Sequence, residues 1–310
     1  MKKFVWVLTI VALLSIAFNV FMINHIASVK REESKYQNTL VFENANSWDT
    51  IFSIHNIKKA HEITTGKGVK VGVIDWFFGY EKHPQLYSGG ADFSGNLASF
   101  REIESHGYWM ALTLREVAPE AEIYALNINM DSEEEKVNSM IRAIDWAIDN
   151  KLDVLTYSSS KFTVENEERL NESVQRALEN NIVTTFIHYY SEENILTDGL
   201  FEYKGSEDYN LREPDLNIYH RDYSVLMLPQ YFEFQNLDSE NAIRNIFLSI
   251  SSTSPVTAGF VALLKSIDNE LKPSEYKKIL QDSSKLVNYE GQVCPRVVDI
   301  YEAVQYLTNR

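Results

Sequence analysis

Short apolar runs alternate with amphipathic stretches along most of this chain. Two stretches, 133–150 and 168–180, place their apolar residues on one face of a helix. Four apolar runs instead read as buried strands: GVKVGVID (68–75), AEIYALNI (121–128), LDVLTYS (152–158) and NIVTTFI (181–187). Strands separated by helices of this length pair in parallel through right-handed crossovers. We therefore predict an α/β fold, a mostly parallel sheet flanked by helices in three layers.

In such a fold the carboxyl ends of the strands display the chemistry. Asp75 ends the first predicted strand, although an aspartate there also caps helices and turns. His106 and Gly107 open a later apolar stretch, where a lone histidine is more often structural. Both interpretations stay open for each residue.

A cluster of hydroxyl residues precedes an apolar helix in SISSTSPVTAGFVALLKS (249–266). The cluster either caps a buried helix or presents a nucleophile at its start. Ser254 suits the first role, because serine is a preferred N-cap and Pro255 is favoured at the first helical position.

The amino terminus carries a charge-free run of 20 residues, Phe4–Ile23, directly after MKK. About 20 apolar residues are enough to cross a bilayer as a helix. No small-x-small cleavage site follows, so we predict an uncleaved signal anchor over 1–25. A cleaved secretory signal is the alternative.

The positive-inside rule places Lys2 and Lys3 in the cytoplasm and the rest of the chain outside it. Residues 26–47 are polar and read as a juxtamembrane linker, which leaves 48–310 as the folded domain. We predict a single-pass protein of the cell membrane with an extracytoplasmic domain, or a secreted protein if the segment is cleaved.

Composition narrows the function classes. With 310 residues, 45% of them hydrophobic, the chain can bury the core of one large domain. Its formal net charge of -15 and the lack of a basic stripe argue against a nucleic-acid partner. The only cysteine, Cys294, excludes an internal disulfide and a thiolate metal cluster.

Three blocks in the order Asp, His, Ser resemble the subtilisin-like serine proteases (subtilases, peptidase family S8). They are VIDWF (73–77), HGYWMA (106–111) and SISSTSPVTAG (249–259). Flanking segments are similar as well, among them VAPEAEIYALNI (117–128) and a closing helix in CPRVVDIYEAVQYL (294–307). The resemblance covers about 250 residues and implies the family's fold and peptidase activity.

The resemblance implies a role for each residue that it matches. Ser251 would be the nucleophile, His106 the base that takes its proton, and Asp75 the carboxylate that orients the imidazole. Ser158, at the end of the third strand, would begin the edge that binds an extended peptide. The implied partner is a peptide or protein substrate, and we predict no cofactor and no metal.

The chain departs from the family pattern around these residues. Trp76 and Phe77 follow the aspartate where the family has threonine and glycine, and Trp109 replaces the second histidine. Ser249 and Ile250 stand where glycine and threonine precede the nucleophile.

The family's oxyanion-hole asparagine has no counterpart in IVTTFIHYYSEE (182–193). Direct counting places Tyr190 at that position, and an insertion of two residues would place His188 there. Both side chains can donate a hydrogen bond. The predicted function is a membrane-anchored serine endopeptidase, and the alternative is a degenerate subtilase that binds a peptide or partner protein without cleaving it.

Overall fold

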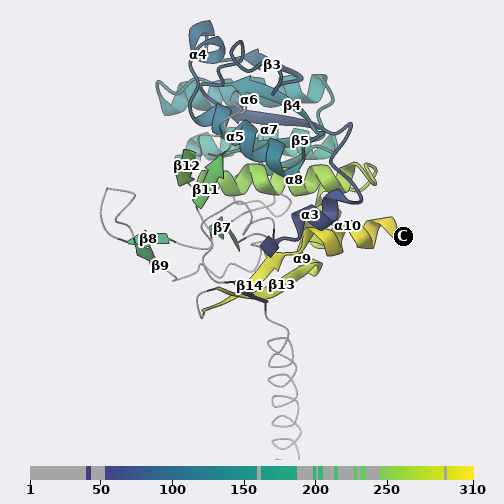
Figure 1. Ribbon diagram of the computed structural model, residues 1–310. Coiled ribbons are helices and arrows are strands. Elements are labelled where there is room, and N and C mark those ends of the chain that lie inside the picture. The colour runs from purple at the N-terminus through teal and green to yellow at the C-terminus, as the bar shows by residue number, and fades with distance from the viewer. Residues whose placement is uncertain are drawn as a thin grey trace, which may run out of the picture.

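The computed structural model describes residues 53–158, 162–186, 250–289 and 292–310, together with short strands at 40–42 and between 198 and 248. Five parallel strands form the central sheet, in the order β3-β4-β2-β5-β6 (Figure 1). Their bounds are β2 Lys70–Asp75, β3 Gly89–Asp92, β4 Glu122–Asn127, β5 Val154–Tyr157 and β6 Val183–Phe186. The predicted α/β fold with a parallel sheet is confirmed.

All four predicted strands form, each shorter by two or three residues in total than its apolar run. The fifth, β3, was not predicted, because its sequence GGAD has no apolar run. Its glycines allow close pairing at the sheet edge, since a Cβ on Gly90 would lie 2.5 Å from the Ala125 carbonyl oxygen.

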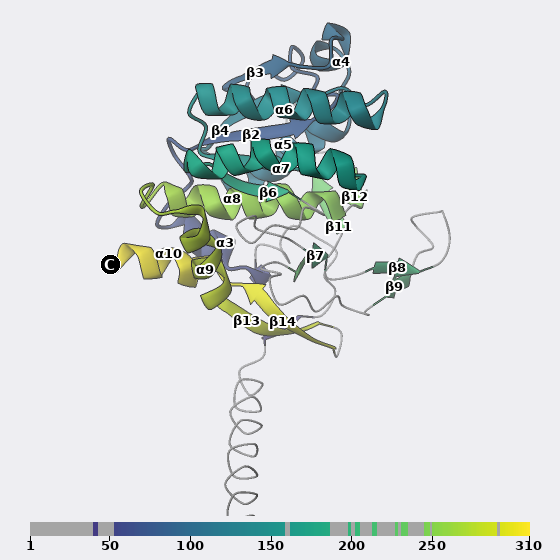
Figure 2. The same cartoon turned by 180° about the vertical axis from the view of Figure 1, so that it is seen from behind.

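Helices cover both faces of the sheet. Helices α6 (Glu133–Asp149) and α7 (Val164–Glu179) lie on one face, and α5 (His106–Val117) and α8 (Thr253–Lys265) lie on the other (Figures 1 and 2). The sheet separates two hydrophobic clusters, because alternate strand residues point to opposite faces. Val73 belongs to the α5 and α8 side and Ile74 to the α6 and α7 side.

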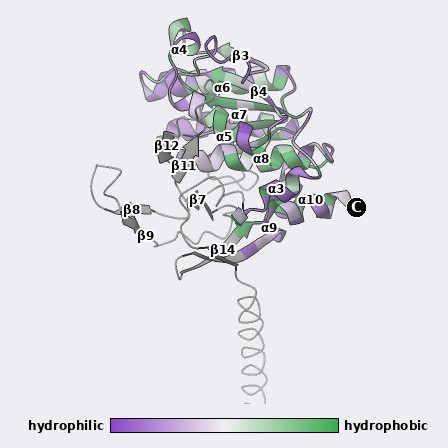
Figure 3. Cartoon of the chain, in the orientation of Figure 1, coloured by the Kyte–Doolittle hydropathy of each residue, from purple (hydrophilic) through white to green (hydrophobic). Residues whose placement is uncertain are grey.

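Helix α8 is buried along its whole length, from Thr253 to Lys265. Most of its residues are apolar or small, which Figure 3 shows as a largely green and white helix across the middle of the molecule. A helix that is apolar all round belongs in a core. Its position fixes the turn before it, η2 (Ile250–Ser252), relative to the sheet.

The predicted helices at 133–150 and 168–180 are α6 and α7. Helix α6 begins as expected after Ser132, whose side chain accepts a hydrogen bond from the Glu135 N–H at 3.2 Å. Helix α7 begins four residues earlier than predicted, at Val164.

The carboxyl-terminal part packs beside α8. It contains α9 (Pro273–Asp282), α10 (Ile300–Thr308) and the antiparallel hairpin β13 (Ser284–Tyr289) and β14 (Gln292–Val298), and α3 (Ile57–His61), which precedes the sheet in the chain, packs against α10. Strand β1 (Leu40–Phe42) pairs with β13. A closing helix forms in 294–307 as expected, but only in its second part: the first part belongs to β14, and α10 begins after Asp299, which caps it. The β-branched run Val297–Val298 and this cap are the local reason.

Shorter elements complete the described part. Helix α4 (Leu97–Arg101) lies between β3 and α5. Six strands lie between 198 and 248: β7 Asp198–Gly199, β8 Glu202–Lys204, β9 Glu213–Asp215, β10 Met227–Leu228, β11 Tyr231–Phe234 and β12 Asn245–Leu248. Strands β11 and β12 pair in antiparallel fashion, and β12 leads to η2.

No helix within the described ranges combines the length and the apolar character needed to cross a membrane. The predicted anchor, Phe4–Ile23, and nearly all of the predicted linker lie outside those ranges. The anchor therefore stays a prediction.

Candidate active site

Two of the residues singled out by sequence meet at the carboxyl end of the sheet. Asp75 is the last residue of β2, and His106 is the first residue of α5. The His106 Nδ1 atom lies 2.8 Å from Asp75 Oδ1 and 2.9 Å from Oδ2. The Asp75 side chain is 1% exposed and that of His106 17%, so the pair faces the surface through its imidazole.

The turn that follows β2 is hydrogen-bonded to the start of α5, which brings these two residues together. The Trp76 N–H donates to Asp75 Oδ1 at 2.8 Å, and the Trp76 carbonyl accepts from the Gly107 N–H at 2.8 Å. The Phe77 carbonyl accepts from the Ser105 N–H, also at 2.8 Å. Backbone bonds thus join the end of β2 to the start of α5, and they set the approach of His106 to Asp75.

Gly107 is needed for this close approach. A Cβ at that position would lie 2.8 Å from the Trp76 carbonyl oxygen and 2.9 Å from the Phe78 ring. Both distances are shorter than van der Waals contact allows, so a larger residue would push α5 away from the turn.

Phe77 has the left-handed backbone angle φ +63°. This region favours glycine, and a bulky residue rarely adopts it. The resemblance places glycine at this position in the family, whereas this chain has a phenylalanine there. Local hydrogen bonds must therefore hold Phe77 in place.

Asn127, the last residue of β4, supplies one of these bonds. Its Oδ1 atom accepts from the Phe77 N–H at 3.1 Å, while its Nδ2 donates to Asp92 Oδ1, Ser94 Oγ and Ser99 Oγ at 2.7, 3.0 and 3.1 Å. The residue is fully buried. It ties the turn to β3 and to the start of α4.

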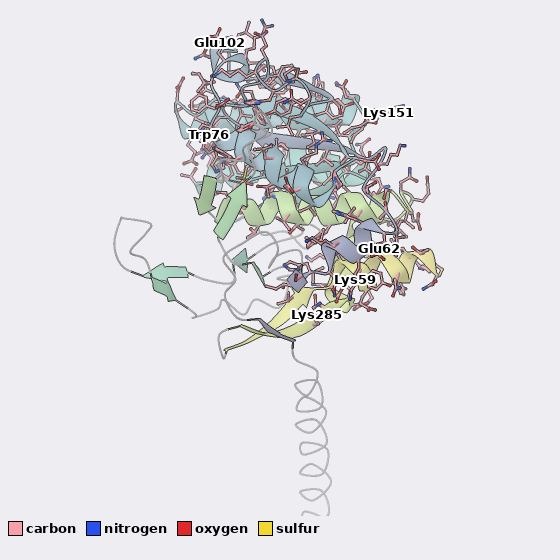
Figure 4. All side chains as sticks on the ribbon, viewed as in Figure 1. Lys59, Glu62, Trp76, Glu102, Lys151 and Lys285 are labelled. Atoms are coloured by element: carbon pink, nitrogen blue, oxygen red, sulfur yellow. The ribbon has the colours of Figure 1, made fainter. Side chains whose placement is uncertain are left out.

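Trp76 packs on His106. The two rings are parallel, with an interplanar angle of 3° and centroids 4.4 Å apart. Trp76 itself is half-buried. It lies at the end of the sheet opposite to Lys151, which precedes β5 (Figure 4).

Ser251 lies in η2, the turn that precedes α8. This turn contacts α5, the helix that begins with His106. Ser251 is half-buried, whereas the neighbouring Ser252 is fully buried and its Oγ atom has no hydrogen-bond partner among the described residues. Of these two serines, Ser251 is the accessible one.

Ser254 does not cap α8, so that prediction was wrong. The helix begins at Thr253, and Ser254 lies inside its first turn. Its hydroxyl is within hydrogen-bond distance of the Tyr157 carbonyl, at 3.1 Å, and of the Thr185 carbonyl, and it shares a hydrogen bond of 2.7 Å with the Thr156 hydroxyl. Ser254 thereby ties the start of α8 to β5 and β6.

Ser158 directly follows β5 and is 2% exposed. Strand β5 is paired with β2 on one side and β6 on the other, so no peptide can add to it along Val154–Tyr157. A peptide edge would have to start beyond Ser158, at 159–161, which lie outside the described residues. Tyr190 and His188, the oxyanion candidates, lie outside them too.

Burial and charge act against each other on the Asp75–His106 pair. Burial raises the pKa of Asp75, and this effect exceeds the lowering by the nearby His106 and by the Trp76 N–H. For His106, burial alone would lower the pKa, but the charge of Asp75 and its hydrogen bond together raise it. The arrangement therefore favours an imidazole that gains a proton readily while Nδ1 stays bonded to the carboxylate.

Metal chemistry finds no support in the described part of the chain. No group of three or more His, Cys, Asp or Glu side chains is placed there to hold an ion.

Sequence reasoning missed two residues of this site, Trp76 and Asn127. Trp76 was noted only as a departure from the family, and its stacking depends on the backbone angle of the next residue. Asn127 had a usable signal, because a polar residue ends the apolar run AEIYALNI beside the end of β2.

Comparisons with known proteins agree with the resemblance. No protein-family model matches the chain. It is 32% identical over 126 residues to subtilisin Savinase of Lederbergia lenta, covering 37% of this chain and 46% of that protein. It is 28% identical over 129 residues to the minor extracellular protease Epr of Bacillus subtilis, covering 38% and 19%. The matches thus span less than half of these curated relatives.

Solved structures show a similar fold over more of the chain. MycP1 of Mycobacterium smegmatis aligns with a TM-score of 0.60 at 14% identity, covering 82% of this chain and 83% of that one. Fervidolysin of Fervidobacterium pennivorans, described as a keratinolytic enzyme related to subtilisin, aligns with a TM-score of 0.57 at 16% identity, covering 80% and 44%. At these identities the likeness concerns the fold.

Proposed function

Because the chain is a divergent member of the subtilisin-like serine protease family, we propose that it is a serine endopeptidase. In this proposal Asp75, His106 and Ser251 form its catalytic triad. The single observation that carries the proposal is the pair of short contacts from His106 Nδ1 to both carboxylate oxygens of Asp75.

The triad chemistry follows from this pair. Asp75 fixes the tautomer of His106 with the proton on Nδ1, which leaves Nε2 as the base. Ser251 is a weak nucleophile until Nε2 takes its proton, after which Oγ attacks the peptide carbonyl. The accessible position of Ser251 in η2, next to α5, supports this role for Ser251 over Ser252.

Labelling with a fluorophosphonate tests the nucleophile. We expect the full chain to be labelled, and Ser251→Ala and His106→Ala to abolish the label while the circular dichroism spectrum is unchanged. Ser252→Ala is the matched control and should be labelled like the wild type. Equal labelling of wild type and Ser251→Ala would remove the nucleophile assignment.

The tetrahedral intermediate needs hydrogen-bond donors at its oxyanion. The backbone N–H of Ser251 is one candidate, and we propose Tyr190 as the second, with His188 as the alternative. Tyr190→Phe should lower turnover by about 10² or more, and His188→Ala should lower it less.

The sequence also favours a second candidate function, because 182–193 has no asparagine at the aligned position. A subtilase without an oxyanion donor would bind a peptide or partner protein in the same cleft without cleaving it. If the wild type cleaves no peptide and Tyr190→Asn creates turnover, this second function replaces the first.

The membrane setting is part of the proposal. Phe4–Ile23 would hold the chain in the membrane, with the domain outside the cytoplasm. Fractionation checks this placement, since a mature chain beginning near residue 27 in the medium would indicate a cleaved signal instead.

A further inference from the structure

We propose that Trp76 is a positioning residue for His106, holding the imidazole face-on and stabilising its protonated form. The proposal rests on the parallel stack of the two rings, with centroids 4.4 Å apart and an interplanar angle of 3°. A stack with so small an angle covers one face of the imidazole. The opposite side of the site is then left for Ser251 and a substrate.

The Trp76 ring is held by the turn that carries it. The Trp76 N–H and carbonyl are both engaged, to Asp75 Oδ1 and from the Gly107 N–H, at 2.8 Å each. The next residue, Phe77, is fixed at φ +63° by bonds to Asn127 and Ser105. Because both peptide groups around Trp76 are fixed, the direction of its Cα–Cβ bond toward His106 is fixed as well.

This arrangement restricts the imidazole in two ways. The contacts from Nδ1 to Asp75 oppose a flip of the ring, and the indole opposes tilting. Nε2 is therefore held in one orientation, on the side of the ring away from the carboxylate. A positioned base of this kind loses little orientational entropy at the moment of proton transfer.

The Trp76 indole should also stabilise a positive charge on the His106 imidazole. A cation over the face of tryptophan is attracted by the ring quadrupole, and tryptophan is the strongest of the aromatic residues in this respect. When His106 takes a proton it becomes such a cation, within the usual 6 Å of a ring centroid. Trp76 should therefore favour the imidazolium that forms during proton transfer.

The electrostatic surroundings of His106 are set by Asp75 and by the groups around the start of α5. Asp75, from β2, is the charged group that acts on it directly. Glu104, just before α5, has its Oε2 atom 2.7 Å from Nε2 of His83, and Tyr108 of α5 stacks on the His83 ring. The turn η2 contacts α5, and its Ser251 hydroxyl carries no charge at neutral pH.

The role of Trp76 rests on the proposed function, but its test does not need turnover. The full chain, labelled with ¹⁵N-histidine and held in detergent micelles, is titrated by NMR, with the His106 signal assigned from its loss in His106→Gln. We expect Trp76→Leu to lower the proton affinity of His106 about two- to fivefold, moving its midpoint to lower pH. Trp76→Phe should lie between leucine and tryptophan.

Trp146→Leu is the matched control, since Trp146 lies on α6, across the sheet, and should leave the titration unchanged. The fluorophosphonate labelling rate is measured against pH for the same variants, and its acid limb should move with the NMR midpoint. If Trp76→Leu lowers the labelling rate but leaves the His106 titration unchanged, the proposal is overturned. A purely structural role of Trp76 would give that result.

The two hypotheses fail separately. If the wild type is not labelled while Trp76→Leu shifts the His106 titration, the peptidase is lost and only the stabilisation of protonated His106 by Trp76 stands. If the wild type is labelled while neither Trp76→Leu nor Trp76→Phe shifts the titration, the peptidase stands and the proposal for Trp76 falls. The phenylalanine variant decides the matter alone if the leucine variant does not fold.

Discussion

The two halves of the candidate site are held in different ways. The Asp75–His106 half depends on a turn fixed by individual hydrogen bonds, with Phe77 at a left-handed angle. The Ser251 half depends on α8, which is buried along its whole length and tied to the sheet by Ser254. The first half therefore departs from the family at Trp76 and Phe77 and offsets the change locally. The second half is held by the burial of α8 in the core.

This difference predicts different consequences of mutation. A change in the turn should alter the chemistry of His106 with a modest effect on the fold. A change at the start of α8 should alter the stability of the whole domain, because that helix contacts α5, β5 and β6.

The largest expected effect belongs to the turn. Asp75→Asn keeps the size of the side chain but removes the charge that fixes the His106 tautomer, and the same change in a well-studied triad protease lowers turnover about 10⁴-fold. We expect a comparable loss in the fluorophosphonate labelling rate. Thermal unfolding should change little, since the amide can keep one hydrogen bond to His106. A variant that labels at the wild-type rate would contradict the triad.

The next prediction concerns acid stability on the α8 side. His55 is fully buried against Phe260, and its Nδ1 atom lies 2.7 Å from the Val298 carbonyl oxygen. Burial lowers the pKa of His55 to about 4 from 6.5, with Lys285 adding to the effect against the Val298 hydrogen bond and Asp299. The folded state thus resists protonation of this ring, while the unfolded chain accepts it.

The contribution of neutral His55 is fully present above pH 6.5 and is lost as the pH falls toward about 4, where the loss levels off. The shift in the pKa of His55 between the unfolded and the folded state corresponds to a total loss of about 3 kcal/mol in the free energy of unfolding. Urea unfolding at pH 7 and pH 5 measures the part of this loss that falls between those two values, and His55→Gln should have a flatter pH dependence than the wild type. An equal slope in both proteins would show that other groups cause the acid sensitivity.

A smaller effect is expected at Ser254. Ser254→Ala leaves the buried carbonyls of Tyr157 and Thr185 without this hydroxyl donor, which costs about 1 to 3 kcal/mol of unfolding free energy. Ser252→Ala is the matched control two residues away, because Ser252 is equally buried and its Oγ atom has no partner among the described residues. Its replacement should be neutral or stabilising. Equal losses in the two variants would contradict the proposed link between α8 and the sheet.

The sequence predicted the features of the site that rest on pattern and chain order. The parallel sheet followed from buried strands alternating with helices, and Asp75 and His106 followed from blocks that resemble a known family. Strand β3 was not predicted, because its residues GGAD have little strand propensity. They pair with β4 through the close approach that glycine allows. Ser254 was misread as a cap, because its partners Tyr157 and Thr185 lie 97 and 69 residues away in the chain.

The stack of Trp76 on His106 could not be predicted for a different reason. It depends on the left-handed angle of Phe77, and a phenylalanine in the sequence argues against that angle. The bonds from Asn127 and Ser105, which come from other parts of the chain, hold this conformation.

The smallest predicted effect tests that angle. In most positions alanine is more stable than glycine by about 0.5 to 1 kcal/mol, because glycine loses more backbone entropy on folding. At Phe77 the order should reverse, since a left-handed angle costs a residue with a Cβ about 1 to 2 kcal/mol. Phe77→Gly and Phe77→Ala both remove the half-buried ring, so their difference isolates the backbone. Urea unfolding should find the glycine variant more stable by up to about 1 kcal/mol. If the alanine variant is the more stable one, the turn relaxes without strain, and the first half of the site is less constrained than its hydrogen bonds indicate.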